Sequence, residues 1–463
     1  MDKLHVCLVN DSFPPLIDGV ANAVVNYAQI INRRYGMASV VTPYYPDASD
    51  DAFDFPIFRY PSLDLTRAVG YRAGMPFSPE IIRMLESMRF DVIHSHCPIT
   101  STMLARALRD RINAPVVLTY HTKFDIDIAN AIRGKLLQEE AARLLAKNIA
   151  ACDEVWTVSR GAGDNLRKLG YEGDYIVMPN GVDFPRGRVS QALIDEVTRD
   201  FDLPDRTPVF LFVGRMMWYK GIKIILDALK SLRDSGVDFR MVFVGGGGDK
   251  EEIMAYSKRL GLDGPVQFAE PIRDRNKIRA WYCRADLFLF PSTFDTNGLV
   301  VREAAACGLA SVLVVGSCAA EDVNDGETGF LIEENAESLA AKLTALCQNR
   351  PAMKQVGENA QRQIYVSWEE AISRAVERYG VVTENYRLGL YPEHDKLTDN
   401  IVHGLASTMD ILGRGRERRQ HVIGEVEAGV QELREELKAE LSDERRRIKN
   451  RLEDIVEHMD RFL

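Results

Sequence analysis

The sequence predicts an α/β protein with two doubly wound parallel sheets, and three observations lead to this fold class. Short apolar runs recur along the chain, and each is followed by a loop of Gly, Pro or polar residues and then by a helical pattern. The runs are apolar throughout rather than at alternate positions, which is typical of sheets covered by helices on both faces. The length of 463 residues and the twelve runs exceed what one sheet holds comfortably, so two domains are expected.

Each apolar run is expected to form one strand. The first sheet should contain residues 4–9, 38–42, 91–96, 115–121, 154–159 and 175–179, and the second residues 208–214, 240–245, 266–269, 287–291, 311–315 and 329–332. Two helix starts are also marked. Ser78 precedes Pro79 and Glu80, which favours a capped helix with proline at its first position, and Ser367 with Glu370 forms a capping box.

The boundary between the domains is expected near residues 184–207, where FPRGRVS and LPDRTP flank one short helix. This division gives a first domain of residues 1–190 and a second of residues 191–366. In doubly wound sheets, ligands bind beyond the carboxyl ends of the strands. The cleft between the two facing sheets is therefore the expected active site.

The C-terminal part of the chain has a different composition. Residues 391–397 are typical of a linker, and residues 414–463 are dense in Arg and Glu without Pro. Their apolar residues follow 4-3 spacing with one stutter, which predicts a coiled coil or a docked amphipathic helix. An isolated solvated helix is the alternative. We expect the helical extension, residues 397–463, to join subunits into a homo-oligomer.

Composition excludes several classes of function. Lys and Arg number 58 against 68 Asp and Glu, and the net charge of −10 argues against nucleic acid as the main partner. No apolar run approaches the ~18–20 residues that cross a bilayer, and the start MDKLHVCLVN lacks the features of a signal peptide. The seven cysteines form no CxxC pair, which indicates free thiols and no zinc site. A cytoplasmic protein is expected.

The segment GRMMWYKG marks a candidate anion site. A buried strand ends at Gly214, and an amphipathic helix is expected to begin near Lys220. Arg215 and Lys220 would place two cations beside a helix N-terminus, an arrangement suited to a polyanion such as a diphosphate. The alternative is an ordinary surface Arg and Lys near a loop.

The segment FDTNGLVVREAAACG marks a second candidate site. Residues 299–307 should form a helix in which Glu303 is surrounded by small apolar residues, where an unpaired carboxylate is costly. A ribose diol would supply two hydroxyl donors to it. Asp295 lies eight positions earlier and can face the same cleft, while the amides of Gly298 and Leu299 would face an anion. The alternative is a structural glutamate bonded to neighbouring backbone.

The first half of the chain offers weaker candidates. Gly19 begins a helix after the first strand, where a small residue lets the backbone approach a ligand. His121 closes its strand and is expected to form hydrogen bonds in the cleft. His94 and His96 share a face and could hold a metal, but a third ligand is not evident. They could equally be satisfied core residues.

Two further motifs have a functional interpretation that their sequence does not favour. The run of four glycines at residues 245–248 invites a dinucleotide interpretation, but G-x-G-x-x-G fails because positions 250 and 251 are Lys and Glu. A tight turn, with Gly246 lining a nucleotide pocket, fits better. Asp125 and Asp127 have the spacing of a metal-binding pair, and we interpret them as loop polarity.

The ordered set of motifs resembles the family 4 glycosyltransferases of the two-domain GT-B type. The motifs are PPLIDGVANAV, DVIHSH, TYHTKF, VSRGAGDNLRKLG, PNGVD, GRMMWYKG, FVGGGGD, ADLFLFPSTFDTNGLVVREAAACG and GETGFLI, and they cover residues 3 to about 388 in the family's order. The resemblance implies a GT-B fold whose closing helix, residues 367–388, crosses back onto the N-terminal domain. TYHTKF and DVIHSHCPITS most resemble the branch that glucosylates diacylglycerol.

The resemblance also implies roles for the candidate residues. Glu303 would bind the nucleotide ribose, and Asp295 with the amides after it would contact the donor sugar. Arg215 and Lys220 would bind the diphosphate, and His121 would contact the donor sugar. Three glycines would line the donor pocket: Gly19, Gly214 and Gly246. The loop that faces the sugar would consist of Asn297, Gly298 and Leu299. The chain departs from the family at two positions, where Asp295 replaces glutamate and Asp18 replaces the first glycine of the N-terminal loop.

The implied activity is that of a retaining hexosyltransferase that needs no metal or other cofactor. The donor would be a nucleotide sugar, UDP-glucose-like, and the acceptor a hydroxyl of diacylglycerol or another membrane lipid. Residues 101–112 and 132–150 carry Arg and Lys beside apolar residues, as expected of an enzyme that contacts the inner face of the cell membrane, although ordinary surface helices look the same. Three alternatives remain: a soluble sugar or polysaccharide acceptor, a GT-B sugar-nucleotide epimerase, and a noncatalytic coiled-coil scaffold.

Overall fold

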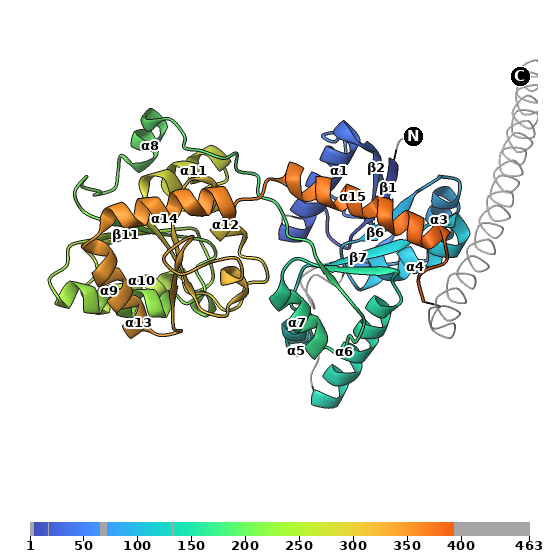
Figure 1. Cartoon of the computed structure of the whole chain (residues 1–463). Coiled ribbons are helices and arrows are strands. Elements are labelled where there is room, and N and C mark those ends of the chain that lie inside the picture. The colour runs from blue at the N-terminus through green and yellow to red at the C-terminus, as the bar shows by residue number, and fades with distance from the viewer. Residues whose placement is uncertain (1–3, 17, 65–71, 132–133, 393–463) are drawn as a thin grey trace, which may run out of the picture.

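The computed structural model describes residues 4–16, 18–64, 72–131 and 134–392. These residues form two α/β lobes connected by the linker that follows β9 (Ile176–Val177) and by residues 364–367, which precede α15 (Trp368–Arg387) (Figure 1). Each lobe contains a parallel sheet, so the predicted class of two doubly wound domains is confirmed. The expected C-terminal coiled coil, residues 397–463, lies outside the described residues.

The N-terminal sheet has seven parallel strands in the order β3-β2-β1-β6-β7-β8-β9. Its strands are β1 (Leu4–Val9), β2 (Gly36–Pro43), β3 (Ile57–Tyr60), β6 (Val92–Ser95), β7 (Val116–Tyr120), β8 (Glu154–Thr157) and β9 (Ile176–Val177). Each of these strands except β3 overlaps one of the six predicted runs. Strand β3 was not predicted, because this short edge strand follows a proline and contains a charged residue, Arg59, which pairs with Asp50. The hairpin of β4 (Ser62–Asp64) and β5 (Arg72–Gly74) was also not predicted.

The C-terminal sheet has six parallel strands in the order β12-β11-β10-β13-β14-β15. The strands are β10 (Val209–Val213), β11 (Arg240–Val244), β12 (Val266–Ala269), β13 (Leu287–Phe290), β14 (Ser311–Val314) and β15 (Phe330–Ile332), one for each predicted run. Strands β10 and β13 lie side by side although β11 and β12 come between them in the sequence. Because β10 and β13 are parallel neighbours, the loops that follow them lie next to each other at the carboxyl ends of the strands.

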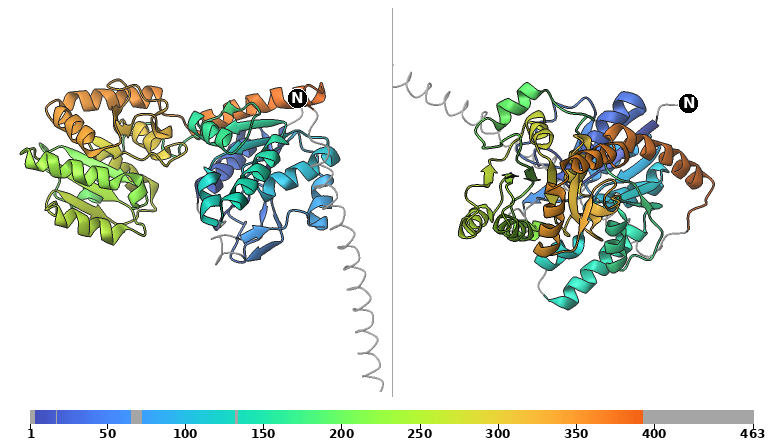
Figure 2. Two further views of the ribbon diagram at one scale, coloured as in Figure 1. Left: turned by 90° about the horizontal axis from the view of Figure 1, so that it is seen from below. Right: turned by 60° about the vertical axis from the view of Figure 1, so that its left-hand side comes forward.

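Helices cover both faces of each sheet (Figure 2). In the N-terminal domain they are α1 (Gly19–Arg34), α3 (Pro79–Glu86), α4 (Thr100–Ile112), α5 (Phe124–Ala131), α6 (Lys135–Ala150) and α7 (Arg160–Lys168). In the C-terminal domain they are α8 (Gln191–Thr198), η1 (Trp218–Lys220), α9 (Ile222–Asp234), α10 (Lys250–Arg259), α11 (Arg275–Arg284), α12 (Leu299–Ala306), η2 (Cys318–Ala320), α13 (Ala336–Cys347) and α14 (Arg350–Gln363). None of the helices described is long and apolar enough to cross a membrane.

The helix starts were predicted with mixed success. The capping box of Ser367 and Glu370 is present at the start of α15 (Trp368–Arg387). Ser78 stands before α3 and Pro79 is in its first turn, as predicted, but the Ser78 side chain makes no capping bond. The interpretation of residues 125–127 as a loop is wrong, since they lie inside α5, whose first turn is continuous with the end of TYHTKF.

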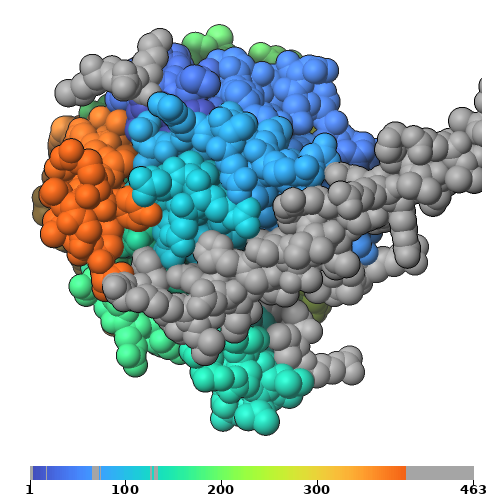
Figure 3. Space-filling model, turned by 90° about the vertical axis from the view of Figure 1, so that its right-hand side faces the viewer, coloured from blue at the N-terminus to red at the C-terminus, as the bar shows by residue number. Residues whose placement is uncertain are grey.

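Helix α15 returns to the N-terminal domain and completes its core. Its buried face packs with α1 and the sheet, as Figure 3 shows for the orange helix beside the blue and cyan residues. The ring of Tyr379 stacks on Trp156 with centroids 5.4 Å apart, and its hydroxyl lies 2.6 Å from Nδ1 of His94. Arg378 forms a bidentate ion pair with Glu154. The last helix of the described chain is therefore an integral part of the first domain.

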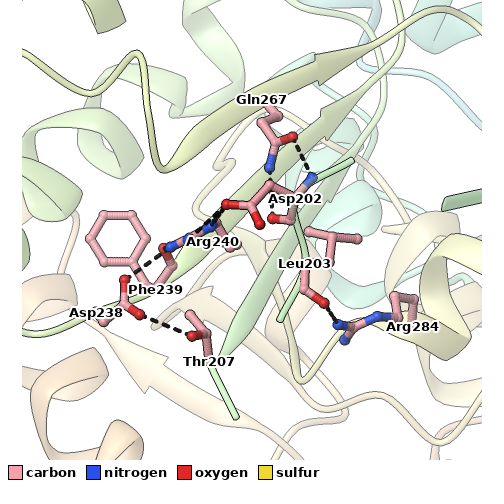
Figure 4. Close-up of polar contacts among 8 residues, drawn as sticks. All are labelled: Asp202, Leu203, Thr207, Asp238, Phe239, Arg240, Gln267 and Arg284. Carbon is pink, nitrogen blue, oxygen red and sulfur yellow. Dashed lines mark hydrogen bonds and ion pairs between the residues drawn. The ribbon is translucent and has the colours of Figure 1, made fainter. Parts of the chain in front are cut away.

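The amino ends of β10 and β11 carry polar groups that satisfy one another (Figure 4). Arg240 pairs with Asp202 and Asp238, and Thr207 donates to Asp238 over 2.9 Å. Gln267 exchanges two hydrogen bonds of 3.1 Å with the backbone of Asp202. At the amino ends of these strands, the polar groups are therefore paired within the protein. The candidate site lies at the opposite, carboxyl ends of the strands.

Candidate active site

The loops that follow β10 and β11 approach each other closely through their backbones. The Met216 amide donates to the carbonyl of Gly246 over 2.8 Å. A Cβ at Gly245 would lie 2.1 Å from the Gly214 oxygen, and one at Gly247 would lie 2.3 Å from the Met216 oxygen. The glycine run therefore exists because the loop after β11 packs against the loop after β10. Gly214 and Gly246, both predicted to line the donor pocket, lie in this junction.

Lys220 and Asp295 meet directly across the ends of β10 and β13. The Lys220 ammonium lies 2.6 Å from Oδ1 of Asp295, and the Ser292 hydroxyl donates to Oδ2 over 2.6 Å. Gly221 makes this approach possible, because it has φ +76° and a Cβ there would lie 2.1 Å from the Pro291 oxygen. The structure thus brings together two residues that were selected from separate motifs.

The surroundings of Lys220 favour a charged ligand. The side chain is buried, and its ammonium lies 5.6–5.8 Å from the ring centroids of Tyr219, Phe290 and Phe294. An ammonium has three donors, so Lys220 can hold Asp295 and still donate to a second anion. Arg215 is exposed at the same strand end, and no acidic partner for it is found among the described residues. Two cationic residues therefore follow β10 at its carboxyl end.

The loop before α12 contains a buried amide side chain without a partner. Asn297 is only 8% exposed, and neither its Oδ1 nor its Nδ2 has a hydrogen bond within the described chain. Leaving such a group unpaired costs about 1–3 kcal/mol. Gly298 follows with φ +57° and lies against Ala319, and the amides from Leu299 onward begin the helix. These groups are those expected where a polyhydroxylated ligand or an anion binds.

Glu303 lies on α12 as predicted, but the argument that it lacks a protein partner is wrong. Its Oε1 is 2.5 Å from Nη2 of Arg275, and the Tyr282 hydroxyl donates to Oε2 over 3.1 Å. Burial raises the pKa of the Glu303 carboxyl, and the Arg275 guanidinium acts in the opposite direction. Arg275 and Tyr282 were not predicted. Both lie on α11, which contains several charged and aromatic residues, and the sequence does not indicate which of these residues face α12.

Arg275 connects this site to the other domain. Its guanidinium lies 4.5 Å from the ring centroid of Phe184 and 3.7 Å from the carboxylate of Asp183 in the linker. Asp183 in turn accepts hydrogen bonds of 3.2 Å from Asn22 and Asn26 on α1. A chain of polar contacts therefore extends from Glu303 to the first helix of the N-terminal domain.

Histidine side chains line the carboxyl ends of β6 and β7. Nδ1 of His96 lies 3.0 Å from Nε2 of His121, and Nδ1 of His121 lies 3.5 Å from Nδ2 of Asn180. His94 is a fully buried core residue bonded to Tyr379 and to Thr119. Burial lowers the pKa of all three histidines, that of His121 to about 3, so they are uncharged at neutral pH. Among the described residues, no group of three or more His, Cys, Asp or Glu could hold a metal.

Gly19 begins α1 next to a helix cap that the family pattern lacks. The Asp18 carboxylate accepts hydrogen bonds from the amides of Val20 and Ala21 over 2.8 and 2.7 Å. A Cβ added at Gly19 would meet no protein atom within 4 Å. Packing therefore does not require this glycine, and the space beside it is open to a ligand.

Comparison with known proteins assigns both halves of the chain. The family model "Glycosyltransferase Family 4" matches residues 17–186, and "Glycosyl transferases group 1" matches residues 194–363. The alpha-monoglucosyldiacylglycerol synthase of Acholeplasma laidlawii is 24% identical over 379 residues, 77% of this chain and 92% of the relative. The D-inositol 3-phosphate glycosyltransferase of Corynebacterium diphtheriae is 29% identical over 307 residues, 63% of this chain and 71% of the relative.

Solved structures share the fold. HepE from Anabaena, crystallised in complex with UDP, superposes with a TM-score of 0.64 at 19% identity, covering 82% of this chain and 100% of HepE. Sucrose-phosphate synthase from Thermosynechococcus elongatus gives a TM-score of 0.66 at 20% identity with the same coverage. Together with the two family models, this likeness shows that the chain belongs to the family 4 glycosyltransferases with the GT-B fold.

Proposed function

We propose that this glycosyltransferase moves a hexose from a UDP-sugar, UDP-glucose-like, to a hydroxyl of a membrane lipid, with retention of anomeric configuration. The observation that carries the proposal is the cluster at the ends of β10 and β13. There Lys220 meets Asp295. Arg215 follows the same strand, and neither Arg215 nor the buried amide of Asn297 has a side-chain partner among the described residues. Cations for a diphosphate and polar groups for a sugar adjoin one another.

The donor would lie across the carboxyl ends of the strands of the C-terminal sheet. Arg215 and Lys220 would bind the diphosphate, and Glu303 would accept hydrogen bonds from the ribose hydroxyls. Asp295 and Asn297 would contact the sugar, together with the amides of Gly298 and Leu299. His121, which is neutral, would contact the sugar from the N-terminal domain, and Gly19 would leave room for the donor. The HepE structures, solved with UDP and with UDP-glucose, support a uridine nucleotide.

The reaction would break the bond between the sugar carbon and the diphosphate oxygen. Arg215 and Lys220 would stabilise the negative charge that grows on the leaving nucleoside diphosphate. The acceptor hydroxyl would form its bond to the same carbon from the same face, and its proton would pass to a phosphate oxygen of the leaving group. Because these fixed cations supply the positive charge, we propose that the reaction needs no divalent metal.

The acceptor is proposed from a surface and from the relatives. On α6, the exposed side chains of Leu136, Leu137 and Leu144 stand beside Lys135 and Arg143, a combination that suits a lipid headgroup surface. The relative from Acholeplasma laidlawii is named for a diacylglycerol product. We therefore propose a lipid acceptor and a peripheral position on the inner face of the cell membrane. The relative named for D-inositol 3-phosphate keeps a soluble acceptor as the second candidate.

Product analysis tests the proposal. Purified protein is incubated with UDP-, GDP- and ADP-sugars, with and without a lipid extract, and nucleotide release is measured. Release of UDP that depends on lipid, with a glycolipid of unchanged anomeric configuration, is the expected result. If nucleotide release requires a soluble sugar, the acceptor is that sugar and not a lipid. An isomerised donor without nucleotide release would indicate an epimerase. Binding of no nucleotide sugar would favour the scaffold.

A further inference from the structure

We propose that Glu321 is a positioning residue that holds the two domains closed over the donor site. Glu321 follows η2 in the C-terminal domain, and its carboxylate reaches the N-terminal domain. Oε2 accepts from the Arg160 amide over 2.6 Å, and Oε1 accepts from the Gly161 amide over 2.5 Å. The inference rests on the proposed function in so far as the site that closes is the donor site.

The contact uses a helix terminus that needs a partner. Arg160 and Gly161 are the first residues of α7, and the amides of a first helical turn have no acceptor within their own helix. Ser159 satisfies the third amide, that of Ala162, over 3.0 Å. The remaining two amides are satisfied from the other domain by a carboxylate, whose charge is favourable at the positive end of a helix. Opening the domains would separate this pair.

The two surfaces are shaped for this approach. A Cβ at Gly161 would lie 2.4 Å from Sγ of Cys318 and 2.9 Å from Oε1 of Glu321, so a larger residue would force these two side chains to shift. The Arg160 guanidinium also donates to the backbone oxygen of Glu321 over 3.0 Å. Glycine at the second position of α7 is thus explained by the neighbouring domain.

The same helix terminus is connected to the sugar-facing loop. The Ser159 hydroxyl, which caps α7, donates over 2.5 Å to the carbonyl of Thr296. Nζ of Lys123 lies 3.3 Å from the carbonyl of Thr293. These two carbonyls flank Asp295, so the N-terminal domain holds the loop on both sides of that residue. Glu321 acts through α7 and Ser159 on the position of this loop.

This arrangement separates nucleotide binding from turnover. The proposed diphosphate and ribose contacts come from Arg215, Lys220 and Glu303, which all belong to the C-terminal domain. Loss of the Glu321 contact leaves them in place, so the affinity for UDP should change by less than about twofold. Turnover requires the closed arrangement around Asp295 and should fall about tenfold, the effect of losing about one charged hydrogen bond.

The experiment compares Glu321→Gln with Gly161→Ala, which acts on the same contact from the other domain. The Gln side chain keeps the size of Glu but removes the charge, and the added methyl group at position 161 pushes the surfaces apart. Glu327→Gln is the matched control, because its exposed carboxylate accepts a hydrogen bond from Gln363 of its own domain. For each variant, UDP affinity is measured by calorimetry, turnover with the donor and acceptor, and the radius of gyration with UDP by small-angle scattering.

Both variants should keep UDP affinity, lose turnover and show a larger radius of gyration, while the control matches the wild type. Wild-type turnover and radius in Glu321→Gln would overturn the proposal. Loss of UDP affinity in parallel with turnover would also overturn it, because Glu321 would then act on the nucleotide site or on folding. If the wild type turns over no donor, the proposed function fails, and scattering alone still decides whether Glu321 holds the domains together.

Discussion

Lys220 and Asp295 are 75 positions apart in the sequence, yet the Lys220 ammonium lies 2.6 Å from the Asp295 carboxylate. Strands β10 and β13 are neighbours in the sheet, and each residue follows one of them. Under the proposed function, a bound diphosphate would share Lys220 with Asp295, and the position of the aspartate would respond to the donor. The ion pair makes the phosphate-facing and sugar-facing parts of the candidate site one unit.

Lys220→Ala should fold but lose about 10²–10³-fold in turnover, the usual scale for removing one contact to transition-state charge. Steady-state kinetics with the best donor measures the loss. Lys223→Ala is the matched control, because Lys223 is exposed on the next helix and pairs with Asp227. Unchanged turnover in Lys220→Ala would contradict the proposed role.

Glu303→Ala should weaken binding of the nucleoside diphosphate by about 1.5–3 kcal/mol, the range for hydrogen bonds to a charged group. The substitution also removes the partner of Arg275 and Tyr282, so thermal unfolding must be followed alongside calorimetry. Glu337→Ala, an exposed change in the first turn of α13, serves as the control. Nucleotide affinity equal to that of the wild type would count decisively against a ribose contact.

Stability should fall as the pH falls below about 6.5, the pKa at which histidines of the unfolded chain take up protons. His94, His96 and His121 have lowered pKa values in the folded protein, so the unfolded state binds more protons in this range. Each contributes at most about 1.4 kcal/mol per pH unit to the slope. Urea unfolding at several pH values should show a shallower slope for His121→Asn. Parallel curves for wild type and variant would contradict this account.

Activity should survive EDTA, because Arg215 and Lys220 supply the positive charge that a metal would bring to the diphosphate. Nucleotide release before and after chelation, with the chelator removed in a parallel sample, is the measurement. If chelation abolishes activity and magnesium or manganese restores it, the positive charges of Arg215 and Lys220 do not suffice for the reaction.

The chain shortened to end at Asp395 should keep nucleotide binding and run as a monomer in light scattering, whereas the full chain should form a dimer. The 4-3 apolar seam of residues 414–463 is the reason for this expectation. Because α15 already completes the core of the N-terminal domain, the shortened chain retains the whole described fold. A full chain that is monomeric at micromolar concentration would exclude the seam as a subunit contact.

The sequence by itself determined twelve of the strands, the two parallel sheets and the motifs of the site. All twelve predicted runs overlap strands, because a parallel strand buried on both faces must be apolar along its whole length. Asp295, Asn297 and Glu303 could be selected because they occupy one short segment at the start of a helix. Strand β3 and the β4–β5 hairpin escaped because edge strands tolerate charged residues and need little apolar sequence.

Only the tertiary structure decided which residues meet. The partners of Glu303, the pairing of His96 with His121 and the contact of Glu321 with α7 join segments that are far apart in the chain. A local pattern records propensity and burial, whereas these contacts depend on strand order, on the crossing of α15 and on how one domain lies against the other. Their physical basis is the requirement that buried charges and helix ends find partners, and several partners were possible until the chain had folded.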